Sequence, residues 1–517
     1  MSKNEKWLLG GILGLALVVR FLWFFDSTYF GFDEARDAFT SQAIYKSLDL
    51  KLMGPPANAP GLNHGVLHWY ILGLVYLIGG GSPFFVSAVF RIANALGVLL
   101  VFFLVKKLFG KKEAFLAAFL YAISFEQTQY AMYMGNPSLS ILSWMLVFSG
   151  AAILFKNKNK FWGLPLMALG VATGAQLELF LVTLLPLSFL ALIILRKSLK
   201  GVGVKSWLLS VVSGLVIISP YIVSEIKYKF QGFSAALALV QKGYNVIGDT
   251  ETKWSVYFKR FISMFHDNVA PLPNEILKVV AILLIVFLVV KAFKHIPYRL
   301  VLLWIFGGLF VVMFGAYNAY YVNVGIGTGI LIGMALFLVW LSQRNKPIAI
   351  GLLMLMVWGN LSLIAKNNKT GLIEDIKTQQ FMNLRDEIGV MDEMFKIAKG
   401  EGFTIRATSM PYRIQSVWAY LFEQYGQKRY GYLPYWEVGP VLGYPGDLPV
   451  PRNGSTCVRF LLQEPNGGIP KVLTEFDLKE EDKFSNVKEV VQIGHFTIQV
   501  RQSVDAICHR NKAVANN

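Results

Sequence analysis

The sequence is poor in charged residues and almost without cysteine. Charged residues make up 16% of its 517 residues, against about 25% in a typical soluble protein, so a wholly soluble protein is excluded. Its two cysteines, Cys457 and Cys508, form no C-x-x-C pair and no zinc pattern. In an oxidising exterior compartment they could form a disulfide; two free thiols are an equal alternative.

Apolar residues, by contrast, are abundant: 55% of the chain is hydrophobic and 14% is aromatic. Several runs approach or exceed the roughly 17–25 apolar residues that cross a bilayer core. We therefore predict a mostly α-helical, polytopic membrane protein with about 11 transmembrane helices. The predicted spans are 7–25, 84–105, 113–125, 139–155, 161–176, 179–195, 206–222, 276–292, 300–316, 322–341 and 348–365.

The formal net charge of +17 is distributed in short basic clusters between these runs. No alternation of basic and aromatic residues resembles a nucleic-acid groove, so we expect no nucleic-acid partner. Regular basic loops are typical of the cytoplasmic side of a membrane protein. They predict a cytoplasmic N-terminus and an extracytoplasmic C-terminus in the cell membrane. The clusters lie at 106–112, 156–160, 196–205, 291–299 and 343–346.

Two further features concern the N-terminal part. The basic opening "MSKNEK" leads into an apolar run without a small-residue cleavage site, so we predict that the first span is retained. The stretch "HGVLHWYILGLVYLIGG" (64–80) is apolar enough to be a span, but counting it as one would place the basic cluster at 106–112 outside. The charge rule favours a helix at the outer interface, with a true span as the alternative.

The chain therefore divides into a membrane domain, 1–365, and a C-terminal part, 366–517. The membrane domain has a first external loop at 26–83, with interfacial helices, and a long external loop at 223–275. The C-terminal part contains the alternating stretches "FTIRATSM" and "FTIQVR" and a helix-like stretch, "MPYRIQSVWAYLFEQYG". Such alternation predicts strands, and hence a mixed α/β extracytoplasmic domain.

An acidic cluster, "YFGFDEARD", follows the first predicted span. Asp33 and Glu34 could simply cap a helix N-terminus, because that position favours acidic side chains. Alternatively, one carboxylate acts as a general base on an acceptor hydroxyl while the second orients it or holds a metal. Arg36 and Asp37 extend the cluster. No D-x-D spacing occurs, so a divalent cation is compatible with the cluster but unsupported.

Other polar residues fall on the predicted external side. Arg91, inside a span, either snorkels to headgroups or holds a phosphate. His64 and His68 have helical spacing but lack the glutamate of H-E-x-x-H, so hydrogen-bonding or interface-anchoring roles are preferred over a zinc site. Asn136 precedes a proline at the start of a span, which favours helix capping over substrate contact. Glu178 is either a turn residue or a cavity-lining residue.

Together these segments resemble a known family. The acidic pair is followed by "HGVLHWYILGLVYLIGG", "SPFFVSAVFR", "KKLFGKKE" and "EQTQYAMYMGNPS". Their order and spacing resemble the GT-C superfamily of polyprenyl-phosphate-sugar-dependent glycosyltransferases. The branch is that of the protein O-mannosyltransferases and the lipid A aminoarabinose transferase (glycosyltransferase family 39-like). The resemblance covers about 7–365 and is strongest over 20–145.

The resemblance implies an inverting, single-displacement transfer at the external face, from a polyprenyl-phosphate sugar to a hydroxyl of a protein, glycan or lipid, with no required cofactor. It implies that Asp33 is the base and Glu34 its neighbour, and it matches Arg91 to the arginine that opens the second span. Departures occur as well. The late external region (317–330) offers Tyr320 and Tyr321 in place of the usual histidine and proline. The second external loop offers Glu126 and Asn136 where relatives often carry an aspartate.

Two other classes of protein fit the sequence less well. A transporter or lipid flippase should carry broken helices or polar groups near the membrane midplane. A scaffold that merely presents the C-terminal domain does not explain why the acidic cluster, Arg91 and the interfacial helix gather on one side. The one-sided placement of polar residues favours the glycosyltransferase.

Overall fold

The computed structural model describes residues 2–57, 61–242, 244–245, 252–316, 320–377, 379–437, 456–465 and 468–504. Cys508, and with it the Cys457–Cys508 pairing, lies outside the described residues. The chain forms two compact units. The helical unit comprises Met1–Leu22, Leu50–His68 and Ser87–Lys369; the mixed unit comprises Trp23–Asp49, Trp69–Val86 and Thr370–Asn517. The break at Lys369 lies close to the predicted domain boundary, but the sequence did not predict that two N-terminal segments cluster with the C-terminal one.

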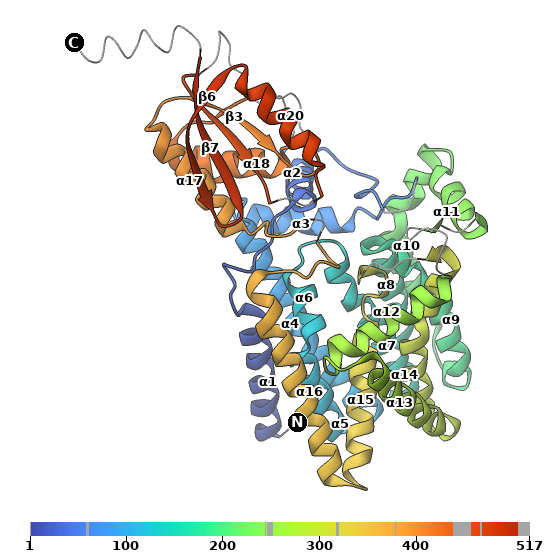
Figure 1. Cartoon of the computed structure of the whole chain (residues 1–517). Helices are drawn as coiled ribbons and strands as arrows, with labels where there is room; N and C mark the ends of the chain where they lie inside the picture. The colour runs from blue at the N-terminus through green and yellow to red at the C-terminus, as the bar shows by residue number, and fades with distance from the viewer. Residues whose placement is uncertain are drawn as a thin grey trace. The chain divides into compact units, whose positions relative to one another are not determined.

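Every predicted span coincides with helix (Figure 1). Five segments, α4, α7, α10, α13 and the stretch Lys346–Thr370 that contains α16, are long and apolar enough to cross a membrane. Five shorter apolar helices accompany them among the described residues. The multi-pass helical architecture is thus confirmed, and the number of crossings stays a prediction. The helices are α1 (Lys3–Phe21), α4 (Pro83–Leu108), α5 (Lys111–Ile123), α7 (Pro137–Lys156), α8 (Gly163–Leu177), α9 (Leu184–Ile194), α10 (Val204–Lys227), α13 (Asn274–Lys294), α14 (Ile296–Phe306), α15 (Ile326–Ser342) and α16 (Lys346–Asn367).

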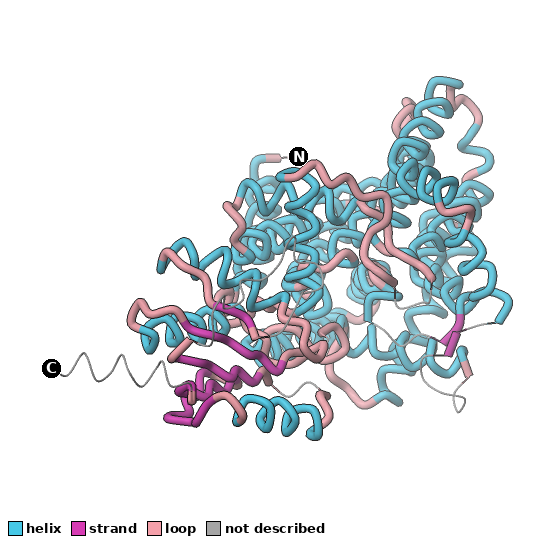
Figure 2. The backbone as a smooth tube through the Cα atoms, turned by 90° about the horizontal axis from the view of Figure 1, so that it is seen from above, coloured by secondary structure: helices cyan, strands magenta, loops and turns pink. Residues whose placement is uncertain are grey.

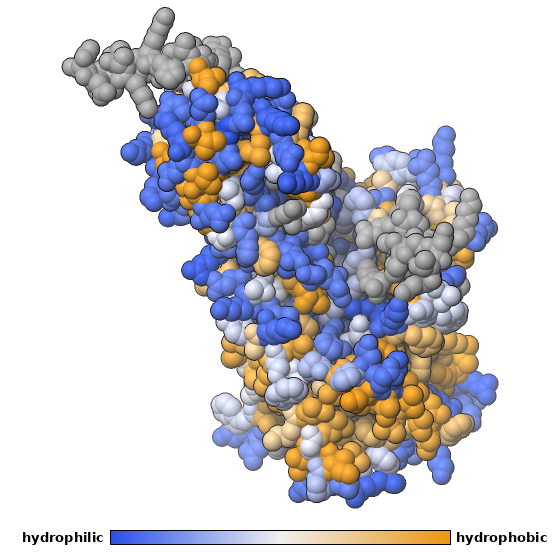
Figure 3. Space-filling view, in the orientation of Figure 1, coloured by the Kyte–Doolittle hydropathy of each residue, from blue (hydrophilic) through white to orange (hydrophobic). Residues whose placement is uncertain are grey.

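The outer surface of this unit is apolar where α13 lies (Figure 3). Ile282, Leu283 and Phe293 of that helix are each more than half exposed. The last turn of the helix is basic and contains Lys291 and Lys294. A surface of large exposed apolar side chains that ends in basic residues is what a lipid-facing helix needs.

Shorter helices occupy the segments between the predicted spans. They are α2 (Phe32–Lys46), α3 (Leu67–Ile78), α6 (Phe125–Met132), α11 (Gln231–Lys242) and α12 (Lys253–Asn268). The prediction of a helix over 64–80 is confirmed by α3, and its place at the interface stays a prediction. The predicted long external loop, 223–275, contains the helices α11 and α12, and its external position stays a prediction. Apolar side chains in helical spacing, such as Tyr257, Phe261 and Phe265, are buried on α12 and drive its packing.

A five-stranded sheet forms the centre of the mixed unit, in the order β4-β3-β5-β7-β6. Figure 2 shows these strands together with helices on both sides of the sheet. The pairs β4–β3 and β3–β5 are parallel; β5–β7 and β7–β6 are antiparallel, with a bulge between Val487 and Glu489 of β6. The predicted α/β character and both predicted strands are confirmed. The elements are β3 (Phe403–Thr408), β4 (Tyr435–Trp436), β5 (Val458–Gln463), β6 (Ser485–Ile493), β7 (Phe496–Ser503), α17 (Leu384–Ala398), α18 (Ser416–Leu421), α19 (Gln427–Tyr430) and α20 (Lys471–Asp482).

Alternation along the strands gives the sheet two different faces. On one face, Phe403 packs edge-to-face on Phe395 of α17. On the other, Arg459 Nε donates to Glu481 Oε1 of α20 at 2.5 Å, and Arg406 Nε lies 3.1 Å from Glu481 Oε2. Successive residues of a strand point to opposite faces of the sheet. One strand can therefore contribute apolar side chains to one face and charged side chains to the other.

The predicted helix at "MPYRIQSVWAYLFEQYG" begins at Ser416. It runs through α18, a π-helical turn at Phe422–Gly426, and α19. The two remaining described strands, β1 (Tyr244–Asn245) and β2 (Gly315–Ala316), pair in parallel within the helical unit.

Candidate active site

The acidic cluster lies in the first turns of α2, in the mixed unit. Gly31 is the N-cap residue, and its backbone N–H donates to Glu34 Oε2 at 3.1 Å. The helix-capping alternative is therefore correct for Glu34, which is buried. Arg36 holds the two aspartates: Nη1 lies 2.6 Å from Asp33 Oδ1, and Nη2 lies 2.8 Å from Asp37 Oδ1. Of these carboxylates, Asp33 is the accessible one, with 45% of its side chain exposed against 6% for Asp37.

These environments separate the proton affinities of the carboxylates. Burial raises the pKa of Asp33 above its ordinary value, although the charge of Arg36 opposes the shift. Burial, followed by the charge of Asp33, raises the pKa of Glu34 to about 8. At neutral pH Glu34 is therefore mostly protonated, while Asp33 keeps an ion-paired carboxylate with an enhanced affinity for a proton.

Three predicted residues meet in the helical unit. Glu178 is fully buried between α8 and the 3₁₀ turn Leu179–Thr183, and its Oε1 lies 3.7 Å from His64 Nδ1. Asn136 Nδ2 donates to the Leu177 carbonyl at 2.7 Å and approaches Glu178 Oε2 at 3.4 Å. Because the Asn136 side chain does not cap α7, the capping prediction is wrong. His64 Nδ1 accepts the backbone N–H of Leu179 at 3.3 Å, which leaves its proton on Nε2.

A neighbour of this group, Gln176, also falls on the predicted external side but was given no role by the sequence. Gln176 is fully buried, and within the described part of the chain neither of its amide atoms has a hydrogen-bond partner. A Cβ at position 65 would lie 2.1 Å from its Oε1, so the backbone of Gly65 covers the amide. A buried amide without partners is costly, so an ordered water or a polar ligand would stabilise this position.

A second polar group surrounds Glu126 in the same unit. Gln127 Nε2 donates to Glu126 Oε2 at 3.2 Å, and Ser124 Oγ donates to Asn268 Oδ1 at 2.9 Å. Glu126 fills the space above Gly327 at the start of α15, where a Cβ would lie 1.7 Å from Oε2. A helix N-terminus favours a carboxylate, which explains the placement.

Tyr320 belongs to this second group. The guanidinium carbon of Arg260 lies 4.1 Å from the centre of its ring, and its carbonyl accepts from Tyr130 Oη at 3.0 Å. Neither Arg260 nor Asn268 was identified from the sequence. The helical spacing of apolar residues on α12 was the signal that could have found them.

The remaining predicted residues lie apart from these groups. Arg91 is fully buried, and its Nη1 donates to the Arg20 carbonyl at 2.6 Å, so the snorkelling alternative is wrong. His68 is buried and packs edge-to-face on Phe90. Since α3 begins at Leu67, His64 precedes the helix and the two histidines share no helical face, which corrects that expectation. Tyr321 packs against a small apolar cluster that contains Phe180.

No metal site is evident in the part of the chain that the structure describes, where no three His, Cys, Asp or Glu side chains gather suitably. Most of the predicted residues thus form an acidic cluster in the mixed unit and two polar groups in the helical unit, while His68, Arg91 and Tyr321 lie outside these groups.

Comparisons with known proteins decide the fold. Residues 63–223 match the family model described as dolichyl-phosphate-mannose-protein mannosyltransferase. The structure is similar to that of ArnT from Cupriavidus metallidurans bound to undecaprenyl phosphate, with a TM-score of 0.60 and 14% identity over 96% of this chain and 98% of that one. The chain has the GT-C fold.

A second structure agrees with this GT-C assignment. The apo oligosaccharyltransferase of Archaeoglobus fulgidus matches with a TM-score of 0.51 and 10% identity, over 84% of this chain and 65% of that one. No curated protein sequence matches. The predicted GT-C fold is confirmed, and residues 63–223 agree with the family model.

Proposed function

We propose that this GT-C protein transfers a sugar from a polyprenyl-phosphate-linked donor to an acceptor hydroxyl at the extracytoplasmic face. The matched mannosyltransferase family and the undecaprenyl phosphate bound by ArnT support this donor class. The observation that carries the proposal is Asp33, an accessible, ion-paired carboxylate at the start of α2.

The proposed reaction is a single displacement with inversion. The acceptor oxygen attacks the anomeric carbon while the bond from that carbon to the phosphate oxygen breaks. The bonding electrons leave with the polyprenyl phosphate, and the hydroxyl proton passes to Asp33. A general base of raised pKa suits this role, because it takes up the proton more readily than an ordinary aspartate does.

The neighbours of Asp33 have supporting roles in this proposal. Arg36 fixes the Asp33 carboxylate from one side and keeps it ionised. Glu34, engaged with the Gly31 N–H, holds the helix turn that presents Asp33 and is not itself the base. The prediction that Asp33, and not Glu34, is the base therefore becomes our proposal.

Substrate binding is proposed for the polar residues of the helical unit. They offer carboxylate, imidazole, amide and phenol groups to sugar hydroxyls, and a guanidinium to phosphate. They are His64, His68, Arg91, Glu126, Asn136, Glu178, Tyr320 and Tyr321. The proposal includes a cytoplasmic N-terminus, an extracytoplasmic segment 366–517 and no required cofactor.

The test is a comparison of two aspartate variants. Purified protein would be given polyprenyl-phosphate mannose carrying radiolabel, together with membranes that contain acceptors. We expect Asp33→Asn to lower the transfer rate by about 100-fold or more while donor binding persists. Asp392→Asn, which also removes an aspartate from an arginine pair (Asp392 Oδ2 to Arg429 Nη1, 2.7 Å), should transfer normally. Full transfer by the double variant Asp33→Asn/Glu34→Gln would overturn the assignment of the base.

A further inference from the structure

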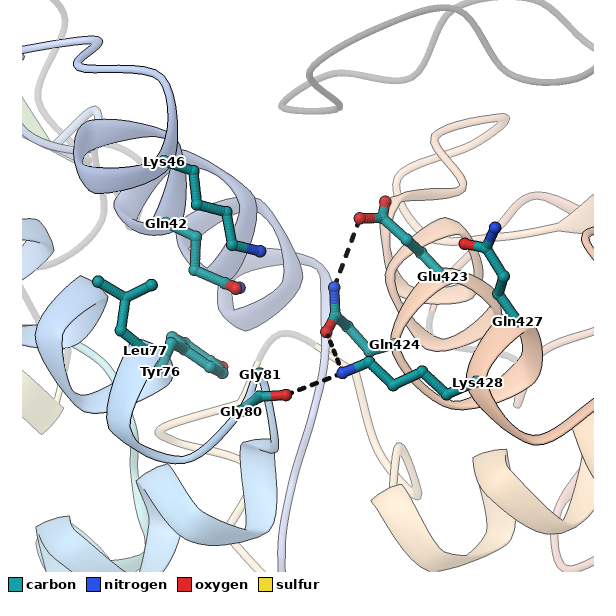
Figure 4. Close-up of a pocket in the computed structure, with 10 residues that line it drawn as sticks. All are labelled: Gln42, Lys46, Tyr76, Leu77, Gly80, Gly81, Glu423, Gln424, Gln427 and Lys428. Atoms are coloured by element: carbon teal, nitrogen blue, oxygen red, sulfur yellow. Dashed lines mark hydrogen bonds between the residues drawn. The ribbon is translucent and has the colours of Figure 1, made fainter. Parts of the chain in front are cut away.

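A polar cavity of about 500 Å³ lies within the mixed unit. This volume is in the range of about 300–1,000 Å³ found for small-ligand sites. Gln42 and Lys46 of α2 extend toward Gln424 and Lys428 on the facing helix (Figure 4). Since Gln42 follows Asp33 by nine residues of helix, the cavity is displaced from the acidic cluster by about 14 Å along α2.

The lining of the cavity has an unusual chemistry. It presents three primary amides, two ammonium groups, one carboxylate and a tyrosine ring, from Gln42, Gln424, Gln427, Lys46, Lys428, Glu423 and Tyr76. Each amide carries both donors and an acceptor. Ring hydroxyls of a sugar also donate and accept, so amides are their natural partners, and an ammonium can donate to further hydroxyls. An apolar ligand would form no hydrogen bonds with these polar groups.

Hydrogen bonds between three chain segments hold the cavity in shape. Lys428 Nζ donates to the Gly80 carbonyl at 2.9 Å and to Gln424 Oε1 at 3.1 Å. Gln42 Nε2 donates to Tyr420 Oη at 2.9 Å, and Tyr420 Oη donates to the Gly81 carbonyl at 2.7 Å. These bonds cross-link α2, the turn after α3 and the α18–α19 helix. A preformed site loses less entropy when it binds a ligand.

Backbone irregularities occur at the same place. The π-helical turn Phe422–Gly426 interrupts the helix that supplies Glu423 and Gln424. Such turns are rare and often mark functional sites. Opposite it, Gly81 has φ +86°, and a Cβ there would lie 2.2 Å from Gln424 Oε1, so the turn must lack a side chain. Both irregularities lie at the lining of the cavity.

We infer that this cavity binds a carbohydrate and that this carbohydrate is part of the acceptor. That the bound carbohydrate belongs to the acceptor rests on the proposed function; that the cavity binds a carbohydrate does not. The polar lining distinguishes the cavity from a site for a lipid chain. Its concave shape, closed on one side by the Gly80–Gly81 turn, distinguishes it from an extended peptide groove.

A cavity-filling variant tests the inference. Full-length protein in detergent, carrying Asp33→Asn to prevent turnover, would be labelled and applied to an array of immobilised glycans. The protein should bind a set of glycans with related structures. For the glycan that binds most tightly, Gln427→Trp should raise the dissociation constant by about tenfold or more. Gln427 lines the cavity and is exposed, so a larger side chain there can take up cavity space without disturbing the core. Gln492→Trp, an equally exposed glutamine outside the cavity, is the matched control.

The outcomes separate this inference from the proposed transfer. Lys46 is an exposed lysine of the lining. Glycan binding by Lys46→Ala tests the cavity independently if Gln427→Trp unfolds. Loss of glycan binding in both variants, with binding retained by Gln492→Trp, supports the cavity even if no sugar transfer is ever detected. Failure of the parent protein to bind any glycan, or binding that survives both substitutions, overturns the inference and leaves the role of Asp33 untouched.

Discussion

At the scale of single residues, two adjacent carboxylates have opposite roles because their surroundings differ. Glu34 is buried, protonated near neutral pH and bonded to the Gly31 N–H. Asp33 remains accessible and paired with Arg36. The sequence could place the pair at a helix start, but it could not tell which side chain turns inward. That choice depends on the packing of the mixed unit.

Glu34 should make the stability of the mixed unit sensitive to pH. Its pKa is about 8 in the folded chain and ordinarily 4.5, so between these values the folded state holds a proton that the unfolded state releases. Stability therefore falls as pH rises through this window. Glu34→Gln keeps the capping oxygen and cannot ionise, so its melting temperature should decline less from pH 5 to 8 than that of the unsubstituted protein. An exposed control, Glu489→Gln, should follow the unsubstituted protein; an identical decline in all three would refute the assignment.

Arg36 should set the pH at which transfer begins to fail. Its charge lowers the pKa of Asp33 against the effect of burial. Removing the charge in Arg36→Gln raises that pKa, so the base becomes protonated at a higher pH and the acidic limb of the kcat/KM profile moves upward. Arg36→Lys retains the charge and should leave the limb close to its original position. A limb that stays fixed in Arg36→Gln would show that Asp33 is not the titrating base.

At the scale of elements, the start of α15 is shaped by a missing side chain. Gly327 leaves room for Glu126 Oε2 and Asn268 Nδ2, both closer to the ideal Cβ position than van der Waals contact allows. The sequence alone suggested only an apolar span here, because the contact joins residues about two hundred positions apart. We expect Gly327→Ala to displace the buried carboxylate.

The expected cost of Gly327→Ala is about 1–3 kcal/mol, as for other overpacked cores. Thermal unfolding of the detergent-solubilised protein should show a lowered midpoint. Gly351→Ala, within α16, meets nothing within 4 Å and should be neutral or slightly stabilising, because alanine favours helix. Equal midpoints for the two variants would mean that Glu126 is free to move aside.

At the scale of the whole molecule, the basic loops predict the orientation of the chain. Lys112 lies at the exposed start of α5, in the cluster 106–112. With Cys457 and Cys508 replaced by serine, Lys112→Cys in intact cells should react only with a thiol reagent that crosses the membrane. Lys399→Cys, at the exposed end of α17, should react with an impermeant reagent. Reaction of Lys112→Cys from outside would make 64–80 a true span.

Long-range packing explains where sequence reasoning stopped. Runs of apolar residues identified every span segment, since a helix in lipid satisfies its own backbone and needs no distant partner. Alternation identified two strands for the same local reason. The His64–Glu178 contact and the clustering of 69–86 with 370–517 join residues far apart in the chain. No local pattern encodes them.

The bulged strand β6 has a consequence for strand pairing at the edge of the sheet. It is an edge of the described sheet, and an exposed edge offers unpaired backbone groups to any neighbouring chain. The irregularity between Val487 and Glu489, with Lys488 between them, breaks the regular row of donors and acceptors. Lys488 and Glu489 place charges at this irregularity, while Val487 and Val490 of the same strand are about half exposed. The bulge, more than the charge of the strand, therefore limits regular strand addition at this edge.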